Sequence, residues 1–310
     1  MSISPDLIVT IGDSSPVQED VHEALRVLRL VKPGIAMIHT VPGPEDLPTI
    51  GQIRASIPGI RLWIQTPANR LASGTTEQAC ALASRWVKFA VDLGAEVLSF
   101  NGEGASALGR SGWKPGQPLN STDVAKRAKD VLAAAASQAN GKIQLAWSSH
   151  DHPLSHNLPW GSIFGAQSPV VASLPQVYID PENGSRGSLA SAKARFAAVK
   201  TQHDALVHRG TIREAFAPAG EGFICYAQSH HAETAATCWL LDQSALAATW
   251  TVRRDGALCD DAGLLALRAD AEMRRRMGHA PGKIVRFQAS NGLTPDGIVG
   301  PATLRALGLL

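Results

Sequence analysis

Short apolar runs alternate with longer amphipathic stretches along most of this 310-residue chain, and this alternation restricts its fold more than any other feature. The runs are rich in Val, Ile, Leu and aromatic residues and are bounded by Gly, Pro or polar residues, which is typical of β-strands. The predicted strands are Leu7–Gly12, Ile35–Thr40, Arg61–Gln65, Val97–Asn101, Gln144–Ser148, Gln176–Asp180, Phe223–Gln228 and Ala247–Val252.

The stretches between these runs carry apolar residues at three- and four-residue spacing, which predicts helices. The clearest are Val17–Leu30, Thr76–Leu93, Thr122–Ala139 and Leu189–His208. About eight strand–helix units in about 255 residues match the count and length of a (β/α)8 barrel. We therefore expect an α/β chain with a TIM-like barrel. A doubly wound open sheet is the alternative.

Polar residues follow almost every predicted strand. In a (β/α)8 barrel the loops after the strands form the active face. Any one polar loop is ordinary, but a polar residue after nearly every apolar run predicts a polar cleft at one end of the barrel. The residues that we expect to bind substrate there are His39, Gln65, Asn101, His150, Gln228 and Trp250.

The character of the chain changes after Gly256. Residues 261–278 have a helical pattern that fits either the last barrel helix or the first helix of a tail. A second helix ends at Asn291-Gly292, where a left-handed residue is favoured, and Asp296-Gly297 predicts a tight turn. Gly300-Pro301 then begins a third helix. These patterns predict a small all-helical tail.

Residues 284–307 of this tail resemble the second half of the peptidoglycan-binding domain 1 family, with its pattern FQ…GL…DGIVGP.T…AL. The family's usual first half, with its own DG segment, is not recognisable upstream. The resemblance implies a three-helix bundle that binds the glycan or the stem peptide of the bacterial wall. It divides the chain into a barrel, 1–256, and a wall-binding tail, 257–310. The wall-binding residues that it implies are Phe287, Gln288, Asp296 and Thr303.

Three carboxylates follow predicted strands and are candidates for catalysis: Glu103, Asp13 and Asp180. Cleavage of a glycosidic bond needs one carboxylic acid to protonate the leaving oxygen and a second carboxylate to attack or stabilise the anomeric carbon. Glu103 lies between glycines just after an apolar strand, where partial desolvation raises a carboxyl pKa, so we expect it to be the general acid. Asp180 or Asp13 is its expected partner.

Two segments resemble the lysozyme-like glycoside hydrolase family 25, namely Asp13-Ser14-Ser15-Pro16-Val17-Gln18 and Asn101-Gly102-Glu103. That family has Asp where this chain has Asn101. The resemblance implies a barrel glycosidase with an acidic pair at the fourth strand. Together with the tail, it makes the whole chain similar to a phage endolysin, a peptidoglycan hydrolase.

Two other functions remain open. Asp13, His152 and His156 have a spacing with which metal-dependent polysaccharide deacetylases hold zinc. Because Pro153 and Pro159 predict a loop rather than a helix there, we expect no metal and no other cofactor. The third possibility is a non-catalytic wall-binding protein.

Composition limits the partners and the location. With 29 basic and 27 acidic residues the net charge is +2, which gives no overall field to hold nucleic acid. No apolar run approaches the roughly 20 residues of a membrane span. The N-terminus has neither the basic nor the apolar region of a secretory signal. We therefore expect a cytoplasmic protein that reaches peptidoglycan at phage lysis or by another export route. The sequence does not set the oligomeric state.

Overall fold

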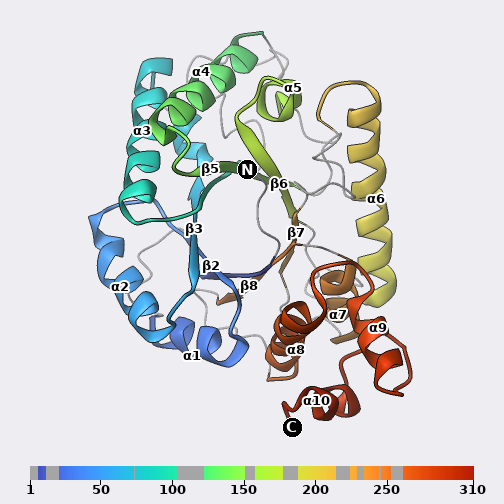
Figure 1. Ribbon diagram of the computed structural model, residues 1–310. Helices are drawn as coiled ribbons and strands as arrows, with labels where there is room; N and C mark the ends of the chain where they lie inside the picture. Colours follow the sequence, from blue (N-terminus) through green and yellow to red (C-terminus); the bar gives the residue numbers. More distant parts are fainter. Residues whose placement is uncertain are drawn as a thin grey trace.

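The computed structural model describes residues 6–11, 21–72, 74–102, 122–150, 158–176, 188–213, 224–228, 234–243, 246–252 and 261–310. The strands lie in a central ring and the helices surround it (Figure 1). Within the described ranges, no helix combines the length and the apolar composition that crossing a membrane requires.

The sheet is parallel throughout and its strand order follows the chain. The strands are β1 Leu7–Ile11, β2 Ile35–His39, β3 Arg61–Pro67, β4 Val97–Asn101, β5 Gln144–His150, β6 Val170–Gln176, β7 Ile224–Gln228 and β8 Leu246–Val252. Consecutive strands from β1 to β6 pair over several residues, whereas β6 and β7 join through the single pair Gln176 and Tyr226. Strand β8 pairs back with β1 and closes the ring. The prediction of a curled parallel sheet is confirmed, and the strand order lacks the reversal of a doubly wound sheet.

Helices flank the sheet and form the tail. They are α1 Val21–Val31, α2 Leu47–Ser56, α3 Thr76–Asp92, α4 Thr122–Ala139, α5 Trp160–Phe164, α6 Leu189–His208, α7 Thr234–Gln243, α8 Asp261–Met277, α9 Lys283–Ser290 and α10 Pro301–Leu307, with short 3-10 turns at Pro44–Asp46 and Ala68–Ala72. Helix α3 shows why they start where they do. The Thr75 hydroxyl accepts from the backbone N–H of Gln78, whose side chain accepts from the backbone N–H of Thr75.

One predicted strand was misplaced. The sixth strand was expected at Gln176–Asp180, but β6 ends at Gln176. Pro169 and Pro175 interrupt the apolar pattern on either side of Val170–Leu174, and proline is a signal against a strand. In the structure Pro175 is inside β6, in register with Ser149 of β5. Asp180 lies outside the described residues.

Alternate strand residues face the two sides of the sheet. One set packs against the surrounding helices in the large outer core, for example Leu7, Val9 and Ile11 of β1. The other set forms a separate apolar cluster inside the ring. It consists of Ile8, Ile35, Met37, Trp63, Val97, Ala146, Ala172 and Leu174.

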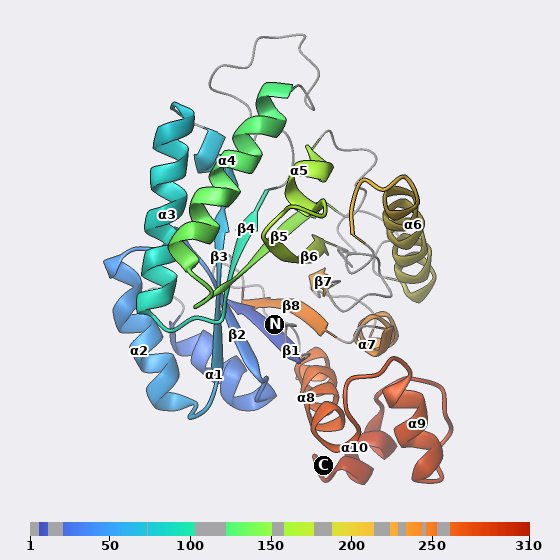
Figure 2. The ribbon, with the colours of Figure 1, turned by 45° about the horizontal axis from the view of Figure 1, so that its top comes forward.

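Helix α8 packs on both the barrel and the tail. It contacts α1, α7 and β1 on one side and α9 and α10 on the other, and Figure 2 shows α9 and α10 beside it at the edge of the barrel. A shared apolar core joins these elements, formed by Cys238 of α7, Ala266, Ala269 and Met273 of α8, Ile284 and Phe287 of α9, and Val299, Leu304 and Leu307. The segment 261–278 therefore serves as the eighth barrel helix and as the first tail helix. The domain boundary at 256 stays a prediction.

A buried charge cluster reinforces this joint. Asp270 of α8 is completely buried, with the Arg274 Nε at 2.6 Å and the Lys283 Nζ at 2.8 Å from its carboxylate oxygens. Burial raises the pKa of the Asp270 carboxyl, but the two cations outweigh burial and hold that pKa below its usual value. Lys283 also donates to the Leu241 carbonyl of α7 at 2.7 Å. The cluster thus ties α7, α8 and α9 together.

Candidate active site

The inside of the ring changes from apolar to polar toward the carboxyl ends of the strands. The apolar inner cluster occupies the amino-terminal half, for example Ile8, Met37 and Trp63. The inward positions that follow, two residues further along each strand, are polar and buried: Thr10, His39, Gln65, Ser99, Ser148 and Gln176. This polar end corresponds to the active face of a (β/α)8 barrel.

Three of these residues form one layer across neighbouring strands. His39 of β2 is in register with Gln65 of β3, which is in register with Ser99 of β4. Gln65 is 1% exposed, and no described residue gives its amide nitrogen or oxygen a hydrogen-bond partner. The same holds for the Ser99 hydroxyl and for the indole N–H of Trp63 below it. A buried polar group without a partner costs about 1–3 kcal/mol, so this layer is suited to meet the polar groups of a ligand.

A hydrogen-bonded cluster lies beside this layer. The Gln176 amide nitrogen of β6 donates to the Asn101 side-chain oxygen of β4 at 2.8 Å and to the Ser148 hydroxyl of β5 at 3.1 Å. The three side chains fix the ends of three adjacent strands relative to one another. Asn101 is half-buried, so it remains accessible from the carboxyl end of the barrel.

The local packing explains the glycine after Asn101. Gly102 donates its backbone N–H to the Ser148 carbonyl at 2.9 Å, which extends the pairing of β4 with β5 by one residue. A Cβ at this position would lie 2.3 Å from the Trp147 ring. Trp147 is completely buried and packs against Phe100 with ring centroids 5.8 Å apart, so it has no room to move away. Gly102 is thus held at the end of β4, and Glu103 is the next residue in the sequence.

The structure brings Asn101, His39 and Gln65 together at the polar end of the barrel; their role in substrate binding stays a prediction. Other predicted site residues belong to strands whose backbone is described but whose side chains are not: His150 ends β5, Gln228 ends β7 and Trp250 lies in β8. The predicted catalytic residues Glu103, Asp13 and Asp180 lie outside the described residues, as do Asp13, His152 and His156 of the zinc alternative.

Sequence reasoning missed Ser99, Ser148, Gln176 and Trp63 as parts of this site. Each lies at an inward position fixed by two-residue alternation from the apolar inner cluster. Extending that alternation to the last residue of each strand would have found Ser99 and Ser148. The sequence did not identify Gln176 as an inward residue because the sixth strand was predicted at Gln176–Asp180, after its actual range.

In the tail, the motif residues lie inside the fold. Phe287, Gln288 and Thr303 are 4%, 2% and 3% exposed. The Gln288 amide nitrogen donates to the Asp296 carboxylate at 2.8 Å and to the Ile298 carbonyl at 2.9 Å, while its oxygen accepts from the Gly297 N–H at 2.8 Å. These contacts hold the loop between α9 and α10 in place.

Residues 282–307 match the putative peptidoglycan binding domain family. The match begins at the amino-terminal end of α9 and ends with α10. In this tail, the buried Phe287, Gln288 and Thr303 have a role in folding, and their expected role in wall binding stays a prediction. Asp296 is exposed. Within the matched segment, the exposed large apolar side chains are Val285 and Ile298, at 37% and 38%, and Val285 lies 3.4 Å from the Cβ position of Gly297.

One solved structure shares the barrel fold, and others are similar at a lower level. A GH18 chitinase from Pseudoalteromonas aurantia is 10% identical, with a TM-score of 0.51, covering 83% of this chain and 97% of that one. Orotidine 5'-phosphate decarboxylase from Pyrococcus horikoshii OT3 is 11% identical, with a TM-score of 0.44, covering 85% and 98%. These likenesses concern the fold alone, because one barrel scaffold carries many chemistries. Among curated proteins, none matches this chain in sequence.

Proposed function

We propose that this protein is an endolysin-like peptidoglycan hydrolase that cleaves a glycosidic bond at the polar end of its barrel, with the tail directing it to the wall. The observation that carries the proposal is the joint occurrence of two features in one chain. The tail matches a peptidoglycan-binding family, and the barrel interior becomes polar at its carboxyl end. The barrel likeness to a chitinase is compatible with a glycan as substrate.

Glu103 is the proposed general acid, with Asp180 or Asp13 as the partner carboxylate. Support comes from the path of the chain, since Gly102 is held by Ser148 and Trp147 at the end of β4. Asn101, two residues earlier, belongs to the polar cluster with Gln176. In this reaction the acid protonates the leaving glycosidic oxygen while the partner carboxylate attacks the anomeric carbon or activates water. The polar layer of His39, Gln65 and Ser99 would bind sugar hydroxyl and amide groups.

The test compares Glu103→Gln with a matched control at the other end of the same strand. Glu103→Gln preserves shape but cannot supply a proton, so lysis of purified wall should fall by about 10²–10⁴-fold. Glu96 precedes β4, and its half-exposed carboxyl lies 3.6 Å from Arg61 at the opposite end of the barrel. Glu96→Gln should therefore leave lysis unchanged within about twofold.

Mass spectrometry of the digest identifies the bond. New reducing sugar ends support the glycosidase, whereas freed acetate or freed amines with sensitivity to chelators would replace it with a metal-dependent deacetylase or amidase. Wall binding without any turnover would show a non-catalytic wall-binding protein. Wild-type lysis by Glu103→Gln would place the general acid elsewhere. We also propose that the protein acts after release from the cytoplasm at phage lysis.

A further inference from the structure

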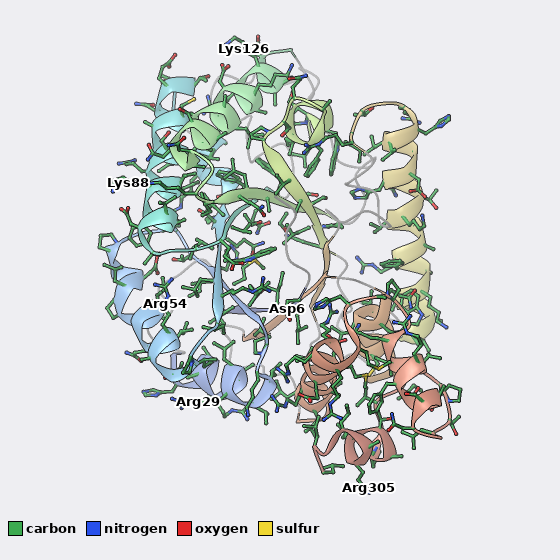
Figure 3. All side chains as sticks on the ribbon, viewed as in Figure 1. Asp6, Arg29, Arg54, Lys88, Lys126 and Arg305 are labelled. Atoms are coloured by element: carbon green, nitrogen blue, oxygen red, sulfur yellow. The ribbon has the colours of Figure 1, made fainter. Side chains whose placement is uncertain are left out.

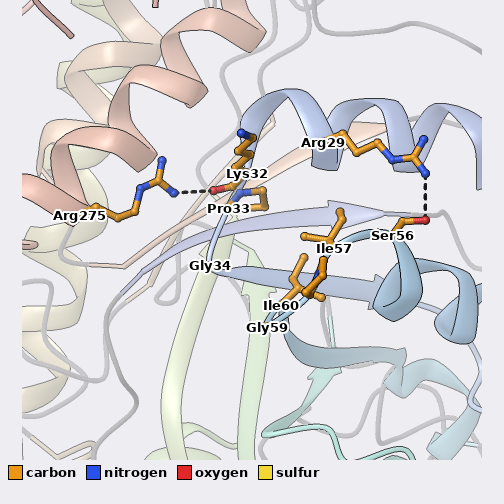
Figure 4. A pocket seen from close by; sticks show the side chains of 10 residues that line it. Arg29, Lys32, Pro33, Gly34, Ser56, Ile57, Gly59, Ile60 and Arg275 are labelled. Carbon is orange, nitrogen blue, oxygen red and sulfur yellow. Dashed lines mark hydrogen bonds between the residues drawn. The ribbon is translucent and has the colours of Figure 1, made fainter. Parts of the chain in front are cut away.

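A cavity of about 390 Å³ lies at the end of the barrel opposite the candidate active site. Its lining comes from the ends of α1 and α2, the turns that follow them and one residue of α8, which places it before β2 and β3 and next to the helix shared with the tail (Figure 4). The lining residues are Arg29, Lys32, Pro33, Gly34, Ser56, Ile57, Pro58, Gly59, Ile60 and Arg275.

The cavity combines apolar walls with a positive rim. Ile57 and Ile60 are half-buried and supply much of the apolar wall. Arg29 and Lys32 are exposed and form no ion pair with any residue in the described part of the chain. Arg275 does pair with a carboxylate, Glu272 at 2.7 Å, but Arg276 shares that same carboxylate. The Asp6 carboxylate lies against the lining residue Gly34 but is paired with Arg61 at 3.0 Å, so cations outnumber carboxylates around the cavity.

The two guanidinium groups are held in position by neighbouring elements. The Arg275 Nη1 donates to the Lys32 carbonyl at 3.1 Å, and the Arg29 Nη2 donates to the Ser56 hydroxyl at 3.0 Å (Figure 4). Each guanidinium keeps further N–H donors unused by these contacts. A planar, preorganised guanidinium matches a carboxylate or a phosphate.

The backbone conformation of Lys32 also supports a binding site for an anion. Lys32 follows the last residue of α1 with a φ of 50°, the left-handed conformation for which glycine is the favoured residue. A lysine at this place keeps a cation at the rim despite the less favourable backbone.

We propose that this cavity is a second wall-binding subsite, which takes a carboxylate attached to small apolar groups, as at the D-alanine end of a peptidoglycan stem peptide. The choice of the wall as the source of this ligand rests on the proposed function. The methyl groups would pack on Ile57 and Ile60 while the carboxylate meets Arg275, Lys32 and Arg29. The site lies outside the matched segment 282–307 and joins the barrel to α8, so it would give the wall peptide a contact that the tail alone does not provide.

The test measures binding of N-acetyl-D-alanyl-D-alanine to the full chain by NMR of isoleucine methyl groups. The methyl signals of Ile57 and Ile60 should shift saturably with this peptide and not with its C-terminal amide. Arg275→Gln and Lys32→Gly should each weaken binding about fivefold or more, and Lys32→Gly also relieves the left-handed backbone, so it should not unfold the protein. Lys142, an exposed lysine in the turn before β5, is the matched control, and Lys142→Gln should bind normally.

Absent shifts at Ile57 and Ile60, equal binding of the amide, or unchanged affinity in both cavity variants would each overturn the proposal. Glycerol phosphate is the second probe. If it shifts these signals and the peptide does not, the ligand is a phosphate, as in wall teichoic acids, and the carboxylate assignment is wrong. Wall lysis is measured separately, so loss of the hydrolase proposal and loss of this subsite give different results.

Discussion

Lys283, the first residue of α9, places its ammonium 2.8 Å from the Asp270 carboxylate of α8, and both side chains are completely buried. The pair links the tail to a helix that also packs on the barrel. The tail is thus not attached as a free module, because its first helix is also the last helix of the barrel.

Replacing Lys283 by Met should lower the free energy of unfolding by about 3 kcal/mol or more, because it leaves a buried carboxylate with Arg274 as its sole remaining cation in the cluster. Urea unfolding measures this change. The control is Lys88→Met, since Lys88 pairs with Asp92 on the outer surface of α3 (Figure 3) and should cost less than about 1 kcal/mol. Equal effects of the two substitutions would show that the buried cluster does not stabilise the joint.

Cys238 provides a pH-dependent probe of the same joint. Burial in the core shared by α7, α8 and the tail raises the pKa of the Cys238 thiol from 9.0 to about 11. Between these pH values the unfolded chain loses the thiol proton while the folded chain keeps it. The contribution of this thiol to the free energy of unfolding should therefore be constant below about pH 9 and fall by about 3 kcal/mol as the pH rises past about 11.

Urea unfolding at a series of pH values tests this, with Cys238→Ala as the comparison. The variant keeps the other alkaline titrations, so the difference between the two pH profiles isolates the thiol. Parallel profiles for the wild type and Cys238→Ala would contradict the burial of this group.

Gly102→Ala should disturb the end of β4, because the new Cβ would lie 2.3 Å from the buried Trp147 ring. Overpacking of this kind costs about 1–3 kcal/mol. Displacement of the following Glu103 should lower wall lysis by more than the loss of folded protein explains. Gly51 in α2 has no atom within 4 Å of its Cβ position, so Gly51→Ala should be neutral or slightly stabilising. Wild-type lysis and stability in Gly102→Ala would mean that Trp147 does not fix this strand end.

The tail surface around Val285 and Ile298 should contact the wall. Both side chains are apolar and exposed, and Val285 lies against Gly297, the residue before Ile298. The double substitution Val285→Ser and Ile298→Ser should reduce pelleting with insoluble wall by about fivefold to tenfold without changing the unfolding midpoint. Leu310→Ser is the control, because Leu310 is 65% exposed at the end of the chain. Retained pelleting by the double variant would move the wall contact to another face.

The sequence predicted much of the fold correctly where local patterns suffice. The range of β4 and those of α4 and α6 agree with the predicted ranges, because apolar periodicity and end residues are local properties. The turn residues of the tail also behave as predicted, with Gly292 and Gly297 at φ values of 68° and 75°. For the candidate site, the polar residues at the ends of the predicted strands pointed to His39, Gln65 and Asn101 but not to their neighbours across the sheet.

Local sequence patterns were sufficient to place most of the helices, strands and turns and to identify the motif by which the tail resembles a peptidoglycan-binding family. Tertiary structure decided which elements meet. The residue before α9, Gly282, has no side chain to cap the helix, and the cap comes from Asp242 of α7, whose carboxylate accepts from the Ile284 N–H at 2.8 Å. Gln176 likewise meets Asn101, 75 positions away, because parallel strands bring distant residues to the same end of the barrel. Such contacts depend on the closure of the sheet, which no local pattern records.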